Sequence, residues 1–189
     1  MIKKATAIIF LLLCSNVLLA ADYNIDIQGA HAFIQFRIKH LGYSWLYGRF
    51  DRFNGKFTYD ETKPENSSVN VDIDIASINT NHAERDKHLK GEDFFEAKKF
   101  PKASFASTSF TSAADGKLTV QGNLTLKGIT KPVTLMAERV GGGPDPWGGF
   151  RQGFEGTTKI ALKDFGFADK LGPASQEAEI MLSVEGVRQ

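Results

Sequence analysis

Cysteine is almost absent from this chain, because Cys14 is the only one among 189 residues. Once the N-terminal segment is removed no thiol remains, which excludes disulfides, thiol nucleophiles and cysteine metal ligands. After residue 21 no hydrophobic run reaches the ~20 residues of a membrane-spanning helix. The net charge is only +1, from 23 basic and 22 acidic residues. Such a balance gives no overall field to attract nucleic acid or an anionic membrane surface.

Catalytic motifs are missing as well. The chain has no nucleophile elbow, no Walker loop and no dinucleotide-binding glycine pattern. The run 141–143 is three glycines, but it precedes Pro144 instead of a helix start and is typical of a flexible loop. Ser104 and Ser107 lie on an expected strand, with no histidine and acid spaced to suggest a triad. We therefore expect a protein that is not an enzyme, with no catalytic residue, catalytic cofactor or metal.

What is present begins with residues 1–21, which have the pattern of a secretory signal peptide. Lys3 and Lys4 make a basic start, an uncharged apolar stretch follows, and Ala20 and Ala21 are small exit residues. The stretch is too short to favour a membrane anchor. We expect cleavage after Ala20 or Ala21, which leaves one domain over 22–189. Loss of the two lysines changes the formal charge from +1 to −1.

Alternation of apolar and polar residues dominates the rest of the chain. In the clearest case, 69–75, every odd position is β-branched and every even position is polar. Turn signals such as Asp115-Gly116 separate the alternating segments and favour antiparallel pairing. The pattern predicts eight strands, at 32–38, 53–59, 69–75, 103–111, 117–126, 133–140, 153–163 and 177–187.

One segment departs from the strand pattern. Asn81 followed by Glu84 has the arrangement of a helix N-cap with its capping-box glutamate, and 85–90 is compatible with a helix. Pro101 prevents the helix from continuing. The fold class is therefore all-β with one helical excursion. Eight antiparallel strands can form a sandwich or a barrel, and glycines on strand faces, such as Gly122, favour a curved, closed barrel.

The helical segment also carries the residues of an alternative hypothesis, a metal-dependent hydrolase that would use His82, Glu84, Asp86 and His88. Metal ligands on a helix stand at i and i+4, whereas His82 and His88 are six residues apart and point to different faces. A charged helix face is the favoured interpretation. His40 shares the strand face of Phe36 and Ile38, which makes it a candidate polar group at a pocket mouth.

Several long motifs cover essentially the whole of 22–189, at His40–Phe50, Thr80–Leu89, Phe100–Pro101, Leu124–Val133, Asp145–Gly149 and Leu171–Glu177. In these motifs the chain resembles the YceI-like family of bacterial periplasmic lipid-binding proteins. The resemblance implies an eight-stranded antiparallel lipocalin-like β-barrel that encloses an elongated apolar tunnel, in the periplasm of a Gram-negative bacterium. It also implies a polyisoprenoid ligand, such as an isoprenoid quinone or a prenyl phosphate.

The leading hypothesis is a protein that binds a long apolar lipid and acts as carrier, store or sensor. Leu89 and Phe94 are expected to close one end of the tunnel, and His40, Tyr43, Arg85 and His88 to be polar groups at its mouth. Inward-facing strand positions are expected to line the tunnel, namely Ile34, Phe36, Ile38, Phe57, Val71, Ile73, Ile75, Leu124, Leu126, Leu135, Phe154, Ile160, Leu182 and Val184.

A third hypothesis is a filled barrel that serves as a stress or interaction protein without a ligand. Large interior residues mixed with small ones can pack solidly or leave a tunnel, so alternation alone leaves both open. The expected partners are the lipid and transient contacts with inner-membrane proteins, with no nucleic acid. A homodimer also stays open, because some members of the family pair.

Overall fold

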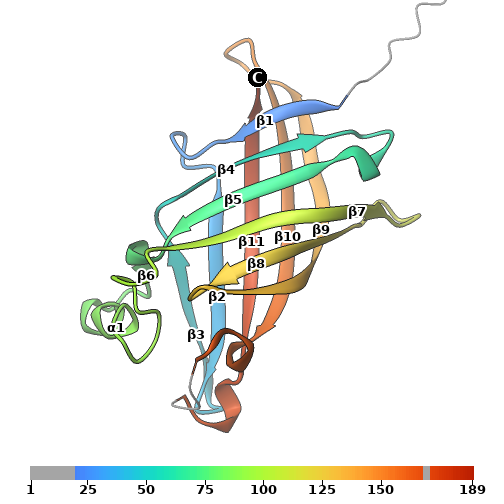
Figure 1. Cartoon of the computed structure of the whole chain (residues 1–189). Helices are drawn as coiled ribbons and strands as arrows, with labels where there is room; N and C mark the ends of the chain where they lie inside the picture. The colour runs from blue at the N-terminus through green and yellow to red at the C-terminus, as the bar shows by residue number, and fades with distance from the viewer. Residues whose placement is uncertain (1–19, 168–170) are drawn as a thin grey trace, which may run out of the picture.

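The computed structural model describes residues 20–167 and 171–189, so the expected signal peptide lies almost wholly outside it. The described strands form one sheet (Figure 1). The strands are β1 (Ala21–Ile25), β2 (Phe33–His40), β3 (Ser44–Phe50), β4 (Phe53–Tyr59), β5 (Ser68–Asp74), β6 (Ile78–Asn79), β7 (Lys102–Ser112), β8 (Leu118–Leu126), β9 (Ile129–Pro144), β10 (Phe150–Ala161) and β11 (Glu177–Arg188).

Helical structure is sparse in the described part of the chain. The α-helix α1 (Ala83–Leu89) follows β6. Short 3-10 turns are η1 (Pro64–Asn66), η2 (Ile75–Ser77), η3 (Leu162–Phe165) and η5 (Pro173–Ser175). None of these helices has the length and apolar character needed to cross a membrane.

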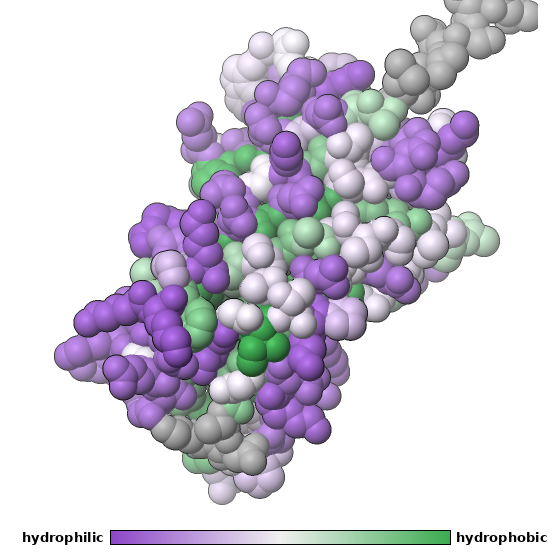
Figure 2. All heavy atoms as spheres, in the orientation of Figure 1, coloured by the Kyte–Doolittle hydropathy of each residue, from purple (hydrophilic) through white to green (hydrophobic). Residues whose placement is uncertain are grey.

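The sheet closes on itself as an eight-stranded antiparallel barrel, which confirms the expected fold class. The ring follows the order β1-β4-β5-β7-β8-β9-β10-β11, and β1 pairs with both β4 and β11 to close it. Closure leaves no free edge within the ring. The face of the molecule that Figure 2 shows is mostly hydrophilic or pale, with smaller hydrophobic areas between.

Strand β11 has different neighbours along its length. Its last residues, 186–188, pair with β1, whereas 178–183 pair with β2. β2 continues into β3, and β3 pairs with β6 through only two residues. The β2–β3 hairpin therefore extends the wall beyond the closed ring, with α1 on the β3 side of this lower part (Figure 1).

The strand prediction was right for most of the ring and incomplete elsewhere. Seven predicted strands belong to the ring, and the eighth, 32–38, is β2 of the extension. Strands β1, β3 and β6 were missed, because they are short or place large aromatic residues on the outside. The strand expected at 133–140 begins at Ile129, since Lys127 (φ 52°) and Gly128 (φ 73°) form the whole turn.

The expectation of a flexible loop at Gly141–Gly143 was wrong. These glycines belong to β9 and pair with 151–153 of β10. A Cβ on Gly142 would lie 2.2 Å from Oε1 of Gln152, and Gln152 Nε2 donates a 2.8 Å hydrogen bond to the Gly141 carbonyl. The glycine run thus makes room for a buried glutamine on the neighbouring strand.

The helix is confirmed, but its expected cap is wrong. An N-cap residue needs an extended backbone, and Asn81 has a positive φ of 61°. His82 is the N-cap instead, and its Nδ1 accepts a 3.2 Å hydrogen bond from the Arg85 N–H. Asp86 accepts hydrogen bonds from the Thr80 N–H and hydroxyl, which joins the helix to the preceding segment.

Candidate functional site: an apolar cavity inside the barrel

The barrel encloses a cavity of about 570 Å³, within the ~300–1,000 Å³ typical of small-molecule sites. Every strand of the ring contributes to its lining, together with β2 and β3, and most of the lining side chains are apolar. In the described part of the chain no buried side-chain nitrogen or oxygen lacks a hydrogen-bond partner. The wall therefore favours a ligand held by dispersed apolar contact.

Most predicted tunnel residues line this one cavity, although whether they touch a ligand stays a prediction. Leu89 and Phe94 reach it from α1 and the segment that follows. The strand residues that line it are Ile34, Phe36, Ile38, Phe57, Val71, Ile73, Leu124, Leu126, Leu135, Phe154, Ile160, Leu182 and Val184.

Ile75 does not line the cavity, contrary to expectation. The alternation of β5 ends at Asp74, whose side chain accepts a hydrogen bond from the Ala76 N–H and starts the 3-10 turn η2. Ile75 is consequently turned into the solid part of the core, where it is 1% exposed and packs in a cluster with Phe94 and Phe165.

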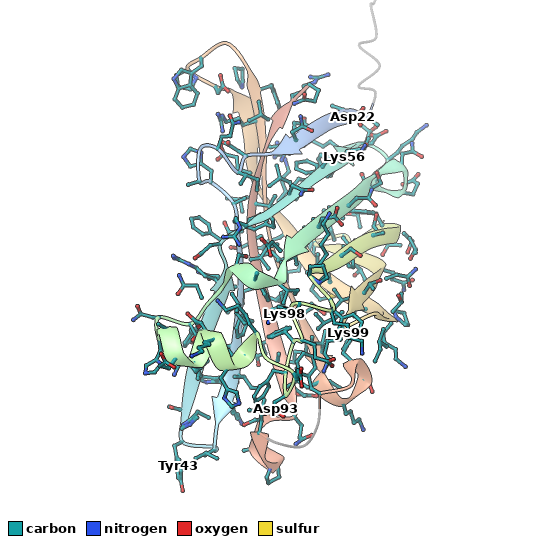
Figure 3. All side chains as sticks on the ribbon, turned by 60° about the vertical axis from the view of Figure 1, so that its left-hand side comes forward. Asp22, Tyr43, Lys56, Asp93, Lys98 and Lys99 are labelled. Atoms are coloured by element: carbon teal, nitrogen blue, oxygen red, sulfur yellow. The ribbon has the colours of Figure 1, made fainter. Side chains whose placement is uncertain are left out.

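Three of the four expected mouth residues line the cavity: His40, Arg85 and His88. Thr80 holds Arg85 in place, since its hydroxyl oxygen accepts from Nε at 2.8 Å and its carbonyl from Nη2 at 2.6 Å. His88 lies edge-on to Phe94, with ring centroids 5.0 Å apart. Tyr43 is outside, 87% exposed at the tip of the β2–β3 hairpin (Figure 3).

Sequence reasoning missed several lining residues. Strand β7 adds Phe105 and Phe110, and β8 adds Leu118 and Val120. The same two-residue alternation could have identified Phe105, Leu118 and Val120, because both strands had been recognised. Phe110 has the opposite parity to Phe105, and the shift in the pairing of β7 with β8 between Ser107 and Ser109 lets both face the cavity. Leu46 and Phe50 could not be found in this way, since β3 was not predicted at all.

Three phenylalanine rings that line the cavity occupy notches left by glycines of neighbouring strands. If the glycine carried a Cβ, that atom would lie 2.3–2.4 Å from a ring carbon in each case. Each glycine leaves space for the phenylalanine ring to lie against the wall. A larger residue in place of the glycine would push the ring toward the lumen. The pairs are Phe36 with Gly48, Phe105 with Gly122 and Phe57 with Gly186.

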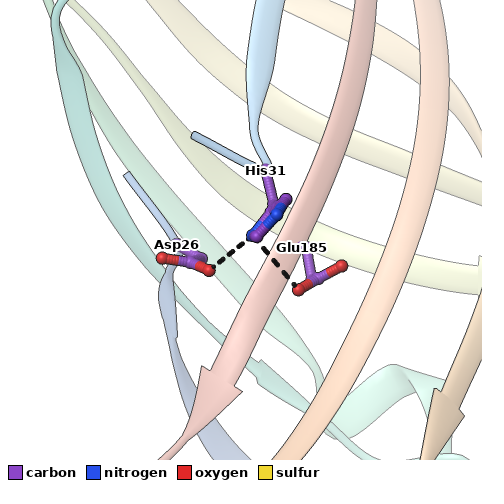
Figure 4. A group of neighbouring side chains, drawn as sticks. All are labelled: Asp26, His31 and Glu185. Atoms are coloured by element: carbon purple, nitrogen blue, oxygen red, sulfur yellow. Dashed lines mark hydrogen bonds and ion pairs between the residues drawn. The ribbon is translucent and has the colours of Figure 1, made fainter. Parts of the chain in front are cut away.

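Away from the cavity, Asp26, His31 and Glu185 form the one group in the described chain whose ligand atoms are close enough to share a metal ion (Figure 4). His31 Nδ1 lies 2.9 Å from Asp26 Oδ2. Arg151 Nη1 lies 2.6 Å from the same oxygen and also contacts Glu185, so its guanidinium stands where a cation would bind. Hydrogen bonds from His31 and Arg151 hold the pKa of Asp26 well below its usual range. The group is an ion-pair network that joins β10 and β11 to the loop between β1 and β2.

The four residues of the hydrolase hypothesis do not form such a group in the part of the chain that is described. His82 caps the helix through Nδ1, and Asp86 accepts hydrogen bonds from Thr80. His88 Nε2 lies 3.7 Å from Asp93, on the cavity side of the helix. Each side chain thus has a separate local role or direction.

Comparison with known proteins accounts for this architecture. The model of the YceI-like domain matches residues 23–186. This chain belongs to the YceI-like family. A UPF0312 protein of Photorhabdus laumondii is 58% identical over 95% of this chain and 93% of its own length. A UPF0312 protein of Pseudomonas aeruginosa is 55% identical over the full length of both.

Solved structures share the YceI-like barrel. Burkholderia cenocepacia BcnA has a TM-score of 0.76 at 25% identity, over 85% of this chain and 98% of that one. The Campylobacter jejuni YCEI protein has a TM-score of 0.72 at 31% identity, over 80% and 90%. A domain of Saccharophagus degradans, described as polyisoprenoid-binding, has a TM-score of 0.64 at 16% identity, over 88% and 98%, which shows a common fold.

Proposed function

We propose that this YceI-like protein holds one long apolar lipid in its barrel, a polyisoprenoid such as an isoprenoid quinone or a prenyl phosphate. It acts as a carrier, store or sensor of that lipid and not as an enzyme. The observation that carries the proposal is the apolar cavity of about 570 Å³. The polyisoprenoid-binding description of the Saccharophagus degradans domain, which has the same fold, supports the choice of ligand class.

Burial of hydrocarbon supplies enough free energy for such binding. Each buried CH₂ group contributes ~0.8 kcal/mol, so one isoprene unit contributes roughly 4 kcal/mol at most. About three units reach the ~12 kcal/mol of nanomolar affinity, before the cost of ordering the chain. No charged anchor is required, and we expect loose selectivity for the head group. Arg85 and His88 line the cavity, and we expect them to meet the polar head of the lipid.

Organic extraction of the freshly purified protein, followed by mass spectrometry, tests the proposal. We expect about one isoprenoid lipid per chain, because an apolar cavity of this size buries most of a hydrocarbon tail. A heat-denatured and refolded sample is the control, since it should release the lipid. A protein that carries no lipid, and does not take up an added isoprenoid quinone, would support the ligand-free alternative.

We also propose export to the periplasm with removal of the signal peptide. The N-terminal pattern carries this proposal, and β1 begins at Ala21, directly after the first of the two expected cleavage points. N-terminal sequencing of the periplasmic fraction is expected to start at Ala21 or Asp22. Recovery of the whole protein with Met1 in the cytoplasm would contradict it.

Gly48→Ala is expected to narrow the cavity. The nearest atoms to an added Cβ are three carbons of the Phe36 ring, at 2.3, 2.7 and 2.9 Å. Because that ring is the free end of a side chain, it can turn toward the lumen without a backbone shift. If it displaces two CH₂ groups of ligand, about 1.6 kcal/mol is lost, or roughly a tenfold weaker affinity.

The measurement for Gly48→Ala is competition of an isoprenoid quinone with a fluorescent apolar probe. Gly143→Ala is the matched control, because an added Cβ there has no atom within 4 Å. Equal quinone affinity in the two variants would show that Phe36 does not limit the space available to the ligand.

A further inference from the structure

Exposed large hydrophobic residues are concentrated on one hairpin. Eight such residues occur in the described part of the chain, and five of them lie on β2, β3 or the turn between them. Single exposed hydrophobic residues are ordinary, whereas a contiguous set marks an interaction surface. The five are Phe33 (43% exposed), Leu41 (60%), Tyr43 (87%), Trp45 (38%) and Tyr47 (55%).

The same hairpin is locally basic. Residues 31–50 contain Arg37, Lys39 and Arg49 but no aspartate or glutamate, although the whole chain is balanced. The Arg37 guanidinium and the Lys39 ammonium lie 4.3 and 5.7 Å from the Trp45 ring centroid.

Acidic groups from outside the hairpin compensate part of this charge. Arg37 pairs with Glu179, and Arg49 with Asp51. Lys39 makes no ion pair with any residue that the structure describes. The charge balance of the whole chain therefore does not extend to the tip of the hairpin.

This surface adjoins the end of the cavity that the hairpin lines. His40, at the end of β2, lines the cavity together with Ile38 and Leu46. The Ser175 hydroxyl donates a hydrogen bond to the Lys39 carbonyl, which holds η5 against the end of the hairpin. Tyr43 stands at the far tip, pointing away from the barrel (Figure 3). A flat partner that contacts the tip would thus lie next to this end of the cavity.

We propose that the β2–β3 hairpin docks the protein on the surface of an anionic phospholipid bilayer. Tryptophan and tyrosine prefer the interface between lipid and water. Lysine and arginine near an anionic surface are attracted to its head groups. Leu41 and Tyr43 enter the interface, while Lys39 faces the head groups. Docking needs no ligand in the barrel, so it goes beyond the proposed function and can hold if that function fails.

The two tryptophans make a matched pair of reporters. Trp45 lies on the hairpin and Trp147 in the β9–β10 turn, at the opposite end of the barrel in Figure 1. With Trp147→Phe, the emission of Trp45 is expected to shift to shorter wavelength on addition of phosphatidylglycerol vesicles. With Trp45→Phe, the emission of Trp147 is expected to stay unchanged. The reverse pattern would overturn the assigned surface.

Charge reversal separates this docking from other associations. Lys39→Glu should weaken vesicle binding about 25-fold, since each cation near an anionic surface contributes about a fivefold factor. Lys117→Glu, in the β7–β8 turn, makes the same charge change away from the hairpin and should have little effect. Equal binding to phosphatidylcholine vesicles, or equal loss in both variants, would overturn the proposal. So would a shift of Trp45 emission that depends on protein concentration without vesicles, which would indicate a second copy as the partner.

Discussion

Ile73→Trp is expected to remove the lipid from the barrel while the barrel stays folded. Ile73 lies near the end of β5, paired with Phe53 of β4 and Ala103 of β7, and it lines the cavity. An indole in its place would fill space that the ligand needs. Displacement of one isoprene unit costs roughly 4 kcal/mol of binding, which is about a thousandfold in affinity.

The fold should tolerate this substitution because the added volume enters an open cavity. Overpacking of a filled core costs about 1–3 kcal/mol, against a typical stability of about 5–15 kcal/mol. Asn70→Trp is the matched control, since Asn70 belongs to the same strand but is exposed and does not line the cavity. Native mass spectrometry of both variants measures occupancy. Undiminished lipid in Ile73→Trp would show that the ligand does not occupy this part of the barrel.

Ile75→Ala should give the opposite result, with a large loss of stability and unchanged lipid binding. Ile75 is 1% exposed and belongs to a cluster of buried residues, but it does not itself line the cavity. Truncation of a buried isoleucine to alanine costs about 2–5 kcal/mol. For a chain of this size that lowers Tm by roughly 10 °C. Ile73→Ala, two residues away, should affect Tm less and lipid affinity more.

Two measurements distinguish Ile73 from Ile75. Thermal unfolding, monitored by circular dichroism, gives Tm, and lipid titration well below Tm gives the affinity. A variant Ile75→Ala that loses lipid affinity but keeps its Tm would place this residue in the ligand site. Comparable effects of both alanine substitutions on Tm would mean that the wall at Ile73 is as solidly packed as the core, which would argue against an open cavity.

The alternation in the sequence identified the wall residues well because a strand has only two faces. Once 69–75 was recognised as a strand, Val71 and Ile73 had to share a side, and both line the cavity. The rule failed at Ile75, where the Asp74 side chain starts a 3-10 turn and the period of two ends. Tyr43, expected as a polar group at the mouth, lies in a turn, where strand alternation gives no guide to the direction of a side chain.

The residues by themselves determined an all-β chain with one helix, antiparallel connections and an apolar face on each strand, because these properties depend on neighbours within a few positions. Only the tertiary structure decided that the ring closes through β1 and that β11 pairs with two different strands. It also decided that the interior stays open. That outcome depends on contacts between strands, such as the space that Gly122 leaves for the ring of Phe105 on the neighbouring strand. Contacts between residues far apart in the chain leave no local pattern in the sequence.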